Sequence, residues 1–315
     1  MGSAHISEEN LRHPQDRLVF IASVVLNLTL MAAAVYLVAN APDWLTSHPV
    51  LRKPLEHVRT LAIIAIFALP AAVIIRNERR VSIRGNSIRL SRDQFASLYD
   101  LLQSHCTKLG LTAAPELYIT NSAIREPAQA FSSWKRDYIV LNQSIVDPAL
   151  ESCGDVMAFI LGRELGRIRL GYTRLWTEIL LTYVLRIPYL NIPITRVRTY
   201  SCDRYGAFLA PDGVRGLIIS VSGRRLLQNV NVEDYIKQSV PHEGLWCRIA
   251  STVTEKPPVL YRVKALYDAG LLDLGQDLTR FHETTSSTGS NDQKPSPPSR
   301  DRPIVARKEA AGDRH

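Results

Sequence analysis

Two arginines that flank a glutamate are the residues of this chain whose spacing bears most directly on chemistry. The segment FILGRELGRIRLG, residues 159–171, lies within a long apolar helix that we predict over residues 150–170. Arg163 and Arg167 are four residues apart, so they share one face of this helix, and Glu164 lies between them in sequence. Histidines at this spacing could hold a metal ion, but a guanidinium group is always protonated and has no lone pair to donate. The segment therefore has the spacing of a metal site without the ligands.

At this point the chain resembles a known family. The segment is similar to the zinc-binding helix of the membrane-anchored metallopeptidases related to HtpX and the CAAX prenyl proteases. In these gluzincins the helix reads H-E-L-G-H, with two histidine ligands and a glutamate that activates water. The matching residues here are Glu164, Leu165 and Gly166. Arg163 and Arg167 stand at the two histidine positions.

A second segment resembles the helix that supplies the third zinc ligand in this family. It reads TYSCDRYGAFLA over residues 199–210. Asp203 matches the family's aspartate, whereas Thr199 stands where the family has a ligating glutamate. All three ligand positions have therefore departed from the family pattern.

The resemblance covers about residues 80–270 and implies a fold. Residues 115–147 resemble the family's active-site sheet, and residues 257–266, PPVLYRVKAL, resemble the start of its C-terminal helix. An edge-strand element that is a candidate for peptide binding corresponds to Gln129, Ala130 and Phe131. The implied fold is α+β: a mostly helical gluzincin-like metallopeptidase with a small antiparallel sheet, preceded by a transmembrane helical hairpin.

We expect no zinc and no other cofactor. No histidine occurs between Cys106 and Pro241, and Cys202 with Glu164 and Asp203 would make a poor zinc site. Glu164 is then a vestige of the family's catalytic glutamate. In the family it acts on a water whose pKa the metal lowers to about 7, and no metal is expected here.

The arginines lead to three hypotheses. One or both guanidinium groups of Arg163 and Arg167 could occupy the former metal space and pair with Asp203 or Glu164, because bidentate pairing suits arginine. Alternatively, both side chains point to solvent in an eroded cleft. In the third hypothesis the cleft binds an anion or a peptide terminus, because further arginines lie nearby in sequence. These are Arg169, Arg174, Arg196 and Arg198.

Two apolar runs predict a membrane anchor over residues 18–75. Residues 18–42 contain no charged side chain and are long enough to cross a bilayer as a helix. Residues 60–75 form a shorter uncharged run bounded by Arg59 and Arg76, whose side chains could reach the interfaces. Six arginines and one glutamate within residues 76–92 predict that this side is cytoplasmic and touches anionic lipid. Residues 1–17 are then a cytoplasmic N-terminus of an integral membrane protein.

The rest of the sequence predicts a cytoplasmic metallopeptidase-like domain over residues 76–283 and a tail over residues 284–315. The tail is rich in Ser, Pro and charged residues, so we expect it to be disordered. Strands are expected at 116–120, 137–142 and within 128–134, with a hairpin of two short strands over 81–90. Helices are expected at 93–109, 214–228 and 258–270. The apolar stretch within 173–195 either packs in the core, packs on the membrane hairpin or enters the membrane interface. The four cysteines form no C-x-x-C pair and read as reduced thiols, with one structural disulfide as the alternative.

Composition and motifs together favour one function over two others. The net charge of +8 could suit nucleic acid, but no basic stretch is interleaved with aromatics, so no nucleic-acid partner is expected. The leading hypothesis is a membrane-anchored pseudopeptidase that binds a protein partner, for example in a membrane-protein complex, as a scaffold or regulator. The alternatives are an active membrane-bound metalloendopeptidase with a non-standard site and a purely structural subunit.

Overall fold

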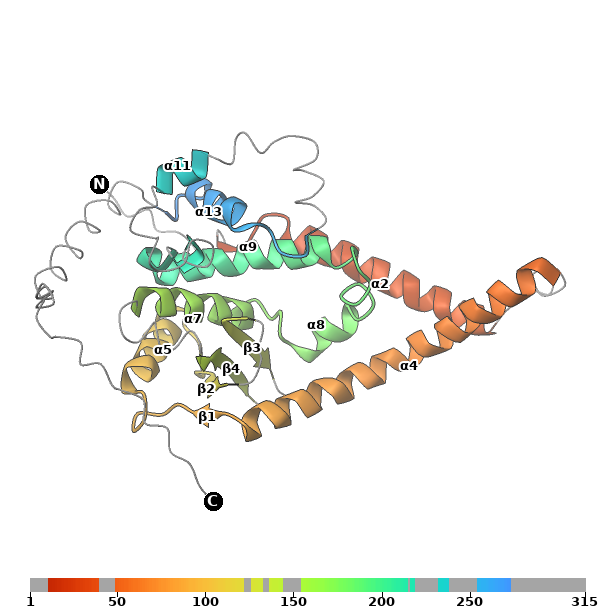
Figure 1. The fold of residues 1–315 in the computed structure, drawn as a ribbon, viewed down its shortest axis with the longest axis horizontal. Coiled ribbons are helices and arrows are strands. Elements are labelled where there is room, and N and C mark those ends of the chain that lie inside the picture. Colours follow the sequence, from red (N-terminus) through yellow and green to blue (C-terminus); the bar gives the residue numbers. More distant parts are fainter. Residues whose placement is uncertain are drawn as a thin grey trace, which may run out of the picture. The chain divides into compact units, whose positions relative to one another are not determined.

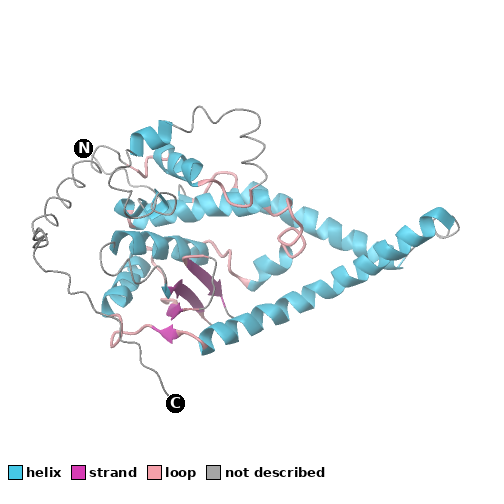
Figure 2. Ribbon diagram, viewed as in Figure 1, coloured by secondary structure: helices cyan, strands magenta, loops and turns pink. Residues whose placement is uncertain are grey.

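The computed structural model describes residues 11–39, 49–121, 126–132, 136–143, 154–214, 216–218, 232–237 and 254–272. Within these ranges the chain is mostly helical and contains one four-stranded sheet (Figures 1 and 2). All of them belong to one compact unit, Met1–Leu274. The predicted tail over residues 284–315 lies outside the described residues.

Two long helices precede the sheet. Helix α2 (Asp16–Ala39) contains the only described stretch, Asp16–Tyr36, whose length and composition would let it cross a membrane. Helix α4 (Pro49–Gly85) contains the second apolar run, continues through the basic residues that follow and contacts α2. Large apolar side chains on α2, among them Leu18, Ile21 and Val25, are exposed. The described residues thus contain one candidate span, and the expectation of a second span stays a prediction.

The hairpin predicted over residues 81–90 is wrong. Helix α4 continues to Gly85, and only Ile88–Arg89 (β1) is a strand. The amide of Asn86 donates to the carbonyls of Ser82 and Ile83, and its side chain also donates to the Ser82 carbonyl at 2.9 Å. These bonds give the carbonyls near the end of the helix hydrogen-bond partners. The Gly85-Asn86 pair, which was expected to form a hairpin turn, therefore ends the helix.

The sheet is mixed, which corrects the expected antiparallel sheet. Its strands are β1, β2 (Glu116–Thr120), β3 (Ala128–Ser132) and β4 (Asp137–Asn142), in the order β1-β2-β4-β3. β3 lies at the edge and pairs antiparallel with β4. β4 lies between β3 and β2 and pairs parallel with β2. The strands β2, β3 and β4 were predicted correctly. The parallel pairing follows from their spatial order, which the alternation of residues does not encode.

Helices α7 (Gly154–Arg169) and α9 (Ile192–Leu209) pack closely at the centre of the unit (Figure 1). Glycines permit this approach. A Cβ on Gly206 would lie 2.7 Å from Cγ of Arg163 and 2.9 Å from Cε2 of Phe159. α7 also contacts β3 and helix α5 (Ala96–Lys108), and α9 contacts helix α13 (Val259–Asp268). This packing fixes the motif residues of α7 and α9 opposite one another.

The stretch within residues 173–195 packs on α2, one of the alternatives above. Leu181, Val184 and Ile194 are fully buried and form an apolar cluster with side chains of α2. Within α2, Oδ1 of Asn27 accepts the backbone N–H of Tyr183 at 2.8 Å. The same stretch contains helix α8 (Leu175–Leu180). The described chain also contains a 3-10 turn, η1 (Pro211–Val214), and helix α11 (Val232–Lys237). Most of the helix predicted over 214–228 lies outside the described residues.

Candidate functional site

Asp203 of α9 lies between two arginines. Nε of Arg163, on α7, forms an ion pair with Oδ1 of Asp203 at 2.8 Å. Arg262, on α13, donates from Nε to Oδ2 and from Nη2 to Oδ1, both at 2.7 Å. The Asp203 side chain is 1% exposed, so its charge is neutralised inside the protein by these cations. Arg262 was not among the predicted site residues, and the signal that could have found it is the arginine in the helix start PPVLYRVKAL.

The carboxylate of Glu164, like that of Asp203, has partners inside the protein. Its Oε2 accepts the backbone N–H of Ala130, in the edge strand β3, at 2.8 Å. The same oxygen lies 3.6 Å from Nε of Arg167. The carboxylate of Glu164 raises the pKa of the Arg167 guanidinium above its ordinary value. Both arginines of the motif therefore pair with a carboxylate, as the first of the three hypotheses expected, and Glu164 also accepts a hydrogen bond from the Ala130 amide.

The residues at the three ligand positions do not fit zinc. Arg163 and Arg167 present fixed cations, and the Thr199 hydroxyl donates to the Thr195 carbonyl at 2.8 Å, within its own helix. Cys202 is a fully buried free thiol, and burial raises its pKa, which disfavours the thiolate that zinc requires. In the described part of the chain, no group of three His, Cys, Asp or Glu side chains forms a possible metal site.

A cleft of about 380 Å³ lies beside these pairs. The predicted site residues that line it are Gln129, Ala130, Phe131, Arg167 and Thr199. Arg163, Glu164 and Asp203 are not part of its lining and lie in the packed region next to it. Among the four nearby arginines named from the sequence, Arg198 lines this cleft, whereas Arg169 lines a different one. The sequence thus identified the edge strand and the helix face that meet at the cleft.

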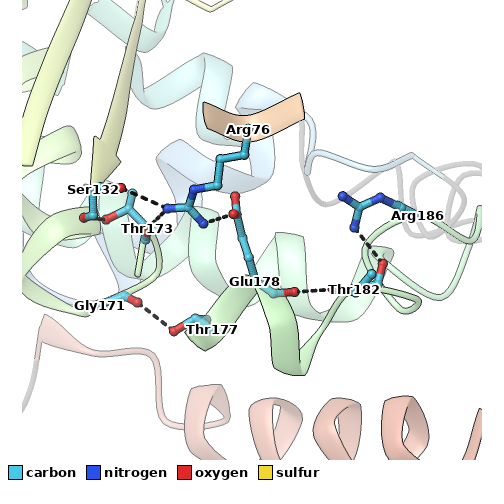
Figure 3. A network of polar contacts seen from close by, with 8 residues as sticks. All are labelled: Arg76, Ser132, Gly171, Thr173, Thr177, Glu178, Thr182 and Arg186. Carbon is cyan, nitrogen blue, oxygen red and sulfur yellow. Dashed lines mark hydrogen bonds and ion pairs between the residues drawn. The ribbon is translucent and has the colours of Figure 1, made fainter. Parts of the chain in front are cut away.

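Arg76, at the end of the second apolar run, lines the cleft. Figure 3 shows its polar contacts. Its Nη2 donates to the carbonyl of Ser132, the last residue of β3, at 3.1 Å, and also to the carbonyl of Thr173. Its Nη1 forms an ion pair with Glu178 of α8. The hydroxyls of Ser132 and Thr173 are 2.6 Å apart. The structure places the guanidinium of Arg76 among these protein groups. That this side chain reaches a membrane interface stays a prediction.

The outward edge of β3 is therefore partly used within the protein. Two backbone groups that do not face β4 have internal partners: the N–H of Ala130 bonds to Glu164, and the carbonyl of Ser132 bonds to Arg76. A peptide that adds to this edge as a further strand cannot use these two groups unless the internal bonds break.

Comparisons with known proteins add no assignment: no protein-family model, no curated protein and no solved structure matches this chain.

Proposed function

We propose that this protein is a membrane-anchored, catalytically inactive homologue of the HtpX-like metallopeptidases that binds a polypeptide partner as a scaffold or regulator. One observation carries the proposal. At the two positions where the resemblance implies zinc-binding histidines, Arg163 and Arg167 pair with Asp203 and Glu164. These side chains supply positive charge at the site permanently, and a metal dication would be repelled by them.

The state of Glu164 supports the absence of hydrolysis. A general base must reach the proton that it removes, and Glu164 instead accepts the amide of Ala130 and faces Arg167. Without a metal to activate water, a general base alone contributes too little for peptide hydrolysis.

We propose further that α2 and α4 form a hairpin in the membrane. The start of α2 and the end of α4 then lie on the same side of the bilayer as the metallopeptidase-like domain. Leu11, just before α2, is fully buried in the main core, and α4 leads directly into β1. Arg12, His13, Arg17 and Arg169 line a second cleft of about 490 Å³ where α2 begins. Basic residues at this level favour a cytoplasmic location and contact with anionic lipid headgroups.

The experiment is an assay of binding and cleavage by the purified full chain in detergent, with denatured casein as the polypeptide. We expect casein to bind and to stay intact, with and without added zinc. Cleavage that a chelator abolishes would overturn the proposal, and so would intact casein that fails to bind. A matched Arg167→Gln variant tests whether binding depends on the cleft that Arg167 lines.

A further inference from the structure

Asn27 is a buried polar residue in the apolar helix α2. It lies within the stretch Asp16–Tyr36, whose length and composition suit a membrane span. Its Oδ1 accepts the backbone N–H of Tyr183 at 2.8 Å and that of Val184 at 3.4 Å. A polar side chain inside a membrane span is costly unless it has partners of this kind. Asn27 therefore ties the chain around Tyr183 and Val184 to α2.

Apolar contacts hold the same part of the chain on the same helix. Three fully buried side chains pack against partly buried side chains of α2; these are Leu181, Val184 and Ile194 on one side and Val19, Phe20 and Val24 on the other. Another face of α2, which carries Leu18, Ile21 and Val25, is exposed. The packing is therefore one-sided, and it leaves the rest of α2 to its surroundings.

The place of Asn27 along α2 sets the depth of this contact. α2 ends at Ala39, so a membrane span of about 20 residues that lies within it begins at or before Phe20. At a rise of about 1.5 Å per residue, Asn27 then lies roughly 10 Å inside the span. Because the N–H of Tyr183 bonds directly to Asn27, this part of the chain lies at the same depth.

The backbone at this depth has partners inside the protein. The N–H of Leu185 donates to the carbonyl of Leu181 at 2.8 Å, and Nη1 of Arg186 donates to the carbonyl of Thr182 at 3.0 Å (Figure 3). Residues 181–184 are buried. Backbone that is not regular helix is tolerated inside a bilayer where its polar groups are bonded and protein covers it, and this arrangement suits that requirement.

Large side chains beside this contact are exposed. Trp176 is 69% exposed and Tyr189 is 67% exposed, and Ile187 is exposed as well. Trp176 belongs to α8, and α8 contacts α2. Tryptophan and tyrosine are enriched where a protein crosses the interface between membrane and water. Lipid that surrounds α2 at this level would also cover these side chains.

We infer that residues 181–190 form a re-entrant segment, which enters the bilayer beside α2 and returns to the domain at the start of α9. Trp176, Ile187 and Tyr189 contact lipid. The inference rests on the proposed function in taking α2 as a membrane span, and it adds that the metallopeptidase-like domain itself enters the membrane. Because Leu185 of the re-entrant segment also lines the cleft of Arg167, the cleft then lies at the membrane surface.

The test uses tryptophan probes in the full chain, reconstituted in lipid nanodiscs. Each probe is introduced into Trp176→Phe, and emission in excess of that variant is the emission of the probe. Quenching is measured with lipids that carry bromine on their acyl chains and, separately, with iodide in the water. We expect the brominated lipids, and not iodide, to quench Tyr189→Trp. The emission that Trp176 adds in the wild type should behave in the same way.

Tyr36 on α2 and Tyr267 on α13 supply matched controls, because both are exposed tyrosines. Tyr36→Trp should be quenched by the brominated lipids, and Tyr267→Trp should be quenched by iodide. Quenching of Tyr189→Trp by iodide alone would overturn the inference. Protection of this probe from both quenchers would also overturn it, in favour of a surface that another protein covers.

The same controls separate this inference from the membrane anchor of the proposed function. If the brominated lipids quench Tyr36→Trp but not Tyr189→Trp, the re-entrant segment is wrong and the anchor stands. If they quench neither probe, the anchor is wrong as well.

A second variant tests the anchoring role of Asn27. Asn27→Leu removes the acceptor of the N–H groups of Tyr183 and Val184, so the Tyr189→Trp probe should lose quenching by lipid and gain quenching by iodide. Thr29→Leu is the matched control, because the exposed Thr29 hydroxyl bonds only to the Val25 carbonyl of its own helix among the printed contacts of α2, at 2.9 Å. It should leave the quenching unchanged. Equal quenching in Asn27→Leu and Thr29→Leu would contradict the role of Asn27.

Discussion

Nε of Arg163 lies 2.8 Å from Oδ1 of Asp203, and the two residues belong to the adjacent helices α7 and α9. The arginine stands at a position where the resemblance implies a zinc ligand. A cation fixed to one helix therefore neutralises a buried carboxylate on the other. Arg262 holds the same carboxylate from α13, so Asp203 joins three helices.

Because Asp203 neutralises two arginines, removing it should cost more than removing one of them. Asp203→Asn leaves the guanidinium groups of Arg163 and Arg262 buried without a countercharge, and we expect a loss of about 3–5 kcal/mol in the free energy of unfolding. Arg163→Gln leaves the bidentate pair with Arg262 intact and should cost about 1–2 kcal/mol. Denaturant unfolding of the two variants in the same detergent measures both values. A larger loss for Arg163→Gln would contradict the central role of Asp203.

Introducing the zinc ligands of the resembled family should create a zinc site. The triple variant Arg163→His, Arg167→His and Thr199→Glu supplies two imidazoles and a carboxylate on the facing helices, the donor set that zinc prefers. We expect this variant to fold and its midpoint of thermal unfolding to rise when zinc is added, because a ligand that binds only the folded state stabilises it. Arg163→His alone is the control and should show no rise. A triple variant that fails to fold would indicate that the frame of the site is not retained.

The close packing of α7 on α9 predicts a strong effect of a single methyl group. In Gly206→Ala the added Cβ would lie within 3 Å of the Arg163 side chain and the Phe159 backbone and ring, so we expect a loss of about 1–3 kcal/mol in stability. Gly85→Ala is the matched control, because no atom lies within 4 Å of its added Cβ. Thermal unfolding should separate the two variants. If both unfold like the wild type, the helices do not approach as closely as described.

His105 should make the fold sensitive to acid. This buried residue of α5 bonds through Nε2 to the carbonyl of Ala158 in α7 at 3.1 Å, and burial lowers its pKa below the ordinary value of 6.5. Below about pH 6.5 the unfolded chain gains a proton that the folded chain resists, so stability is lost as the pH falls and is retained above that value.

His105→Gln keeps a donor for the Ala158 carbonyl but has no group that titrates in this range. Unfolding measured above and below about pH 6.5 should show a smaller loss in this variant than in the wild type. An equal loss in both proteins would indicate that other groups cause the acid sensitivity.

Local patterns predicted the elements better than their arrangement. The strands ELYIT and DYIVLN have the predicted bounds, and α7 contains the motif as expected, because apolar periodicity and β-branched residues report directly on local structure. The mixed order of the sheet depends on how distant segments meet. The helix that replaces the predicted hairpin near Gly85 shows that a Gly-Asn pair can also end a helix.

The site was predictable in its residue types and only partly in its contacts. The ion pair of Arg167 follows from its spacing of three residues from Glu164 on one helix. The ion pair of Arg163 was among the contacts expected with Asp203. The bond from the Ala130 amide to Glu164 and the position of Arg76 depend on long-range packing, which no local pattern encodes. Arg198 was one of four candidate arginines, and only the structure shows that it lines this cleft.

Guanidinium groups fixed at the positions of the resembled zinc ligands should keep zinc out of the site, so the metal content of the purified protein is the decisive measurement. The full chain is produced in zinc-supplemented medium, purified without chelator, and analysed for zinc by elemental mass spectrometry. We expect far less than one zinc ion per wild-type chain and close to one per chain of the triple variant. One tightly held zinc ion per wild-type chain would show that the arginines do not exclude the metal.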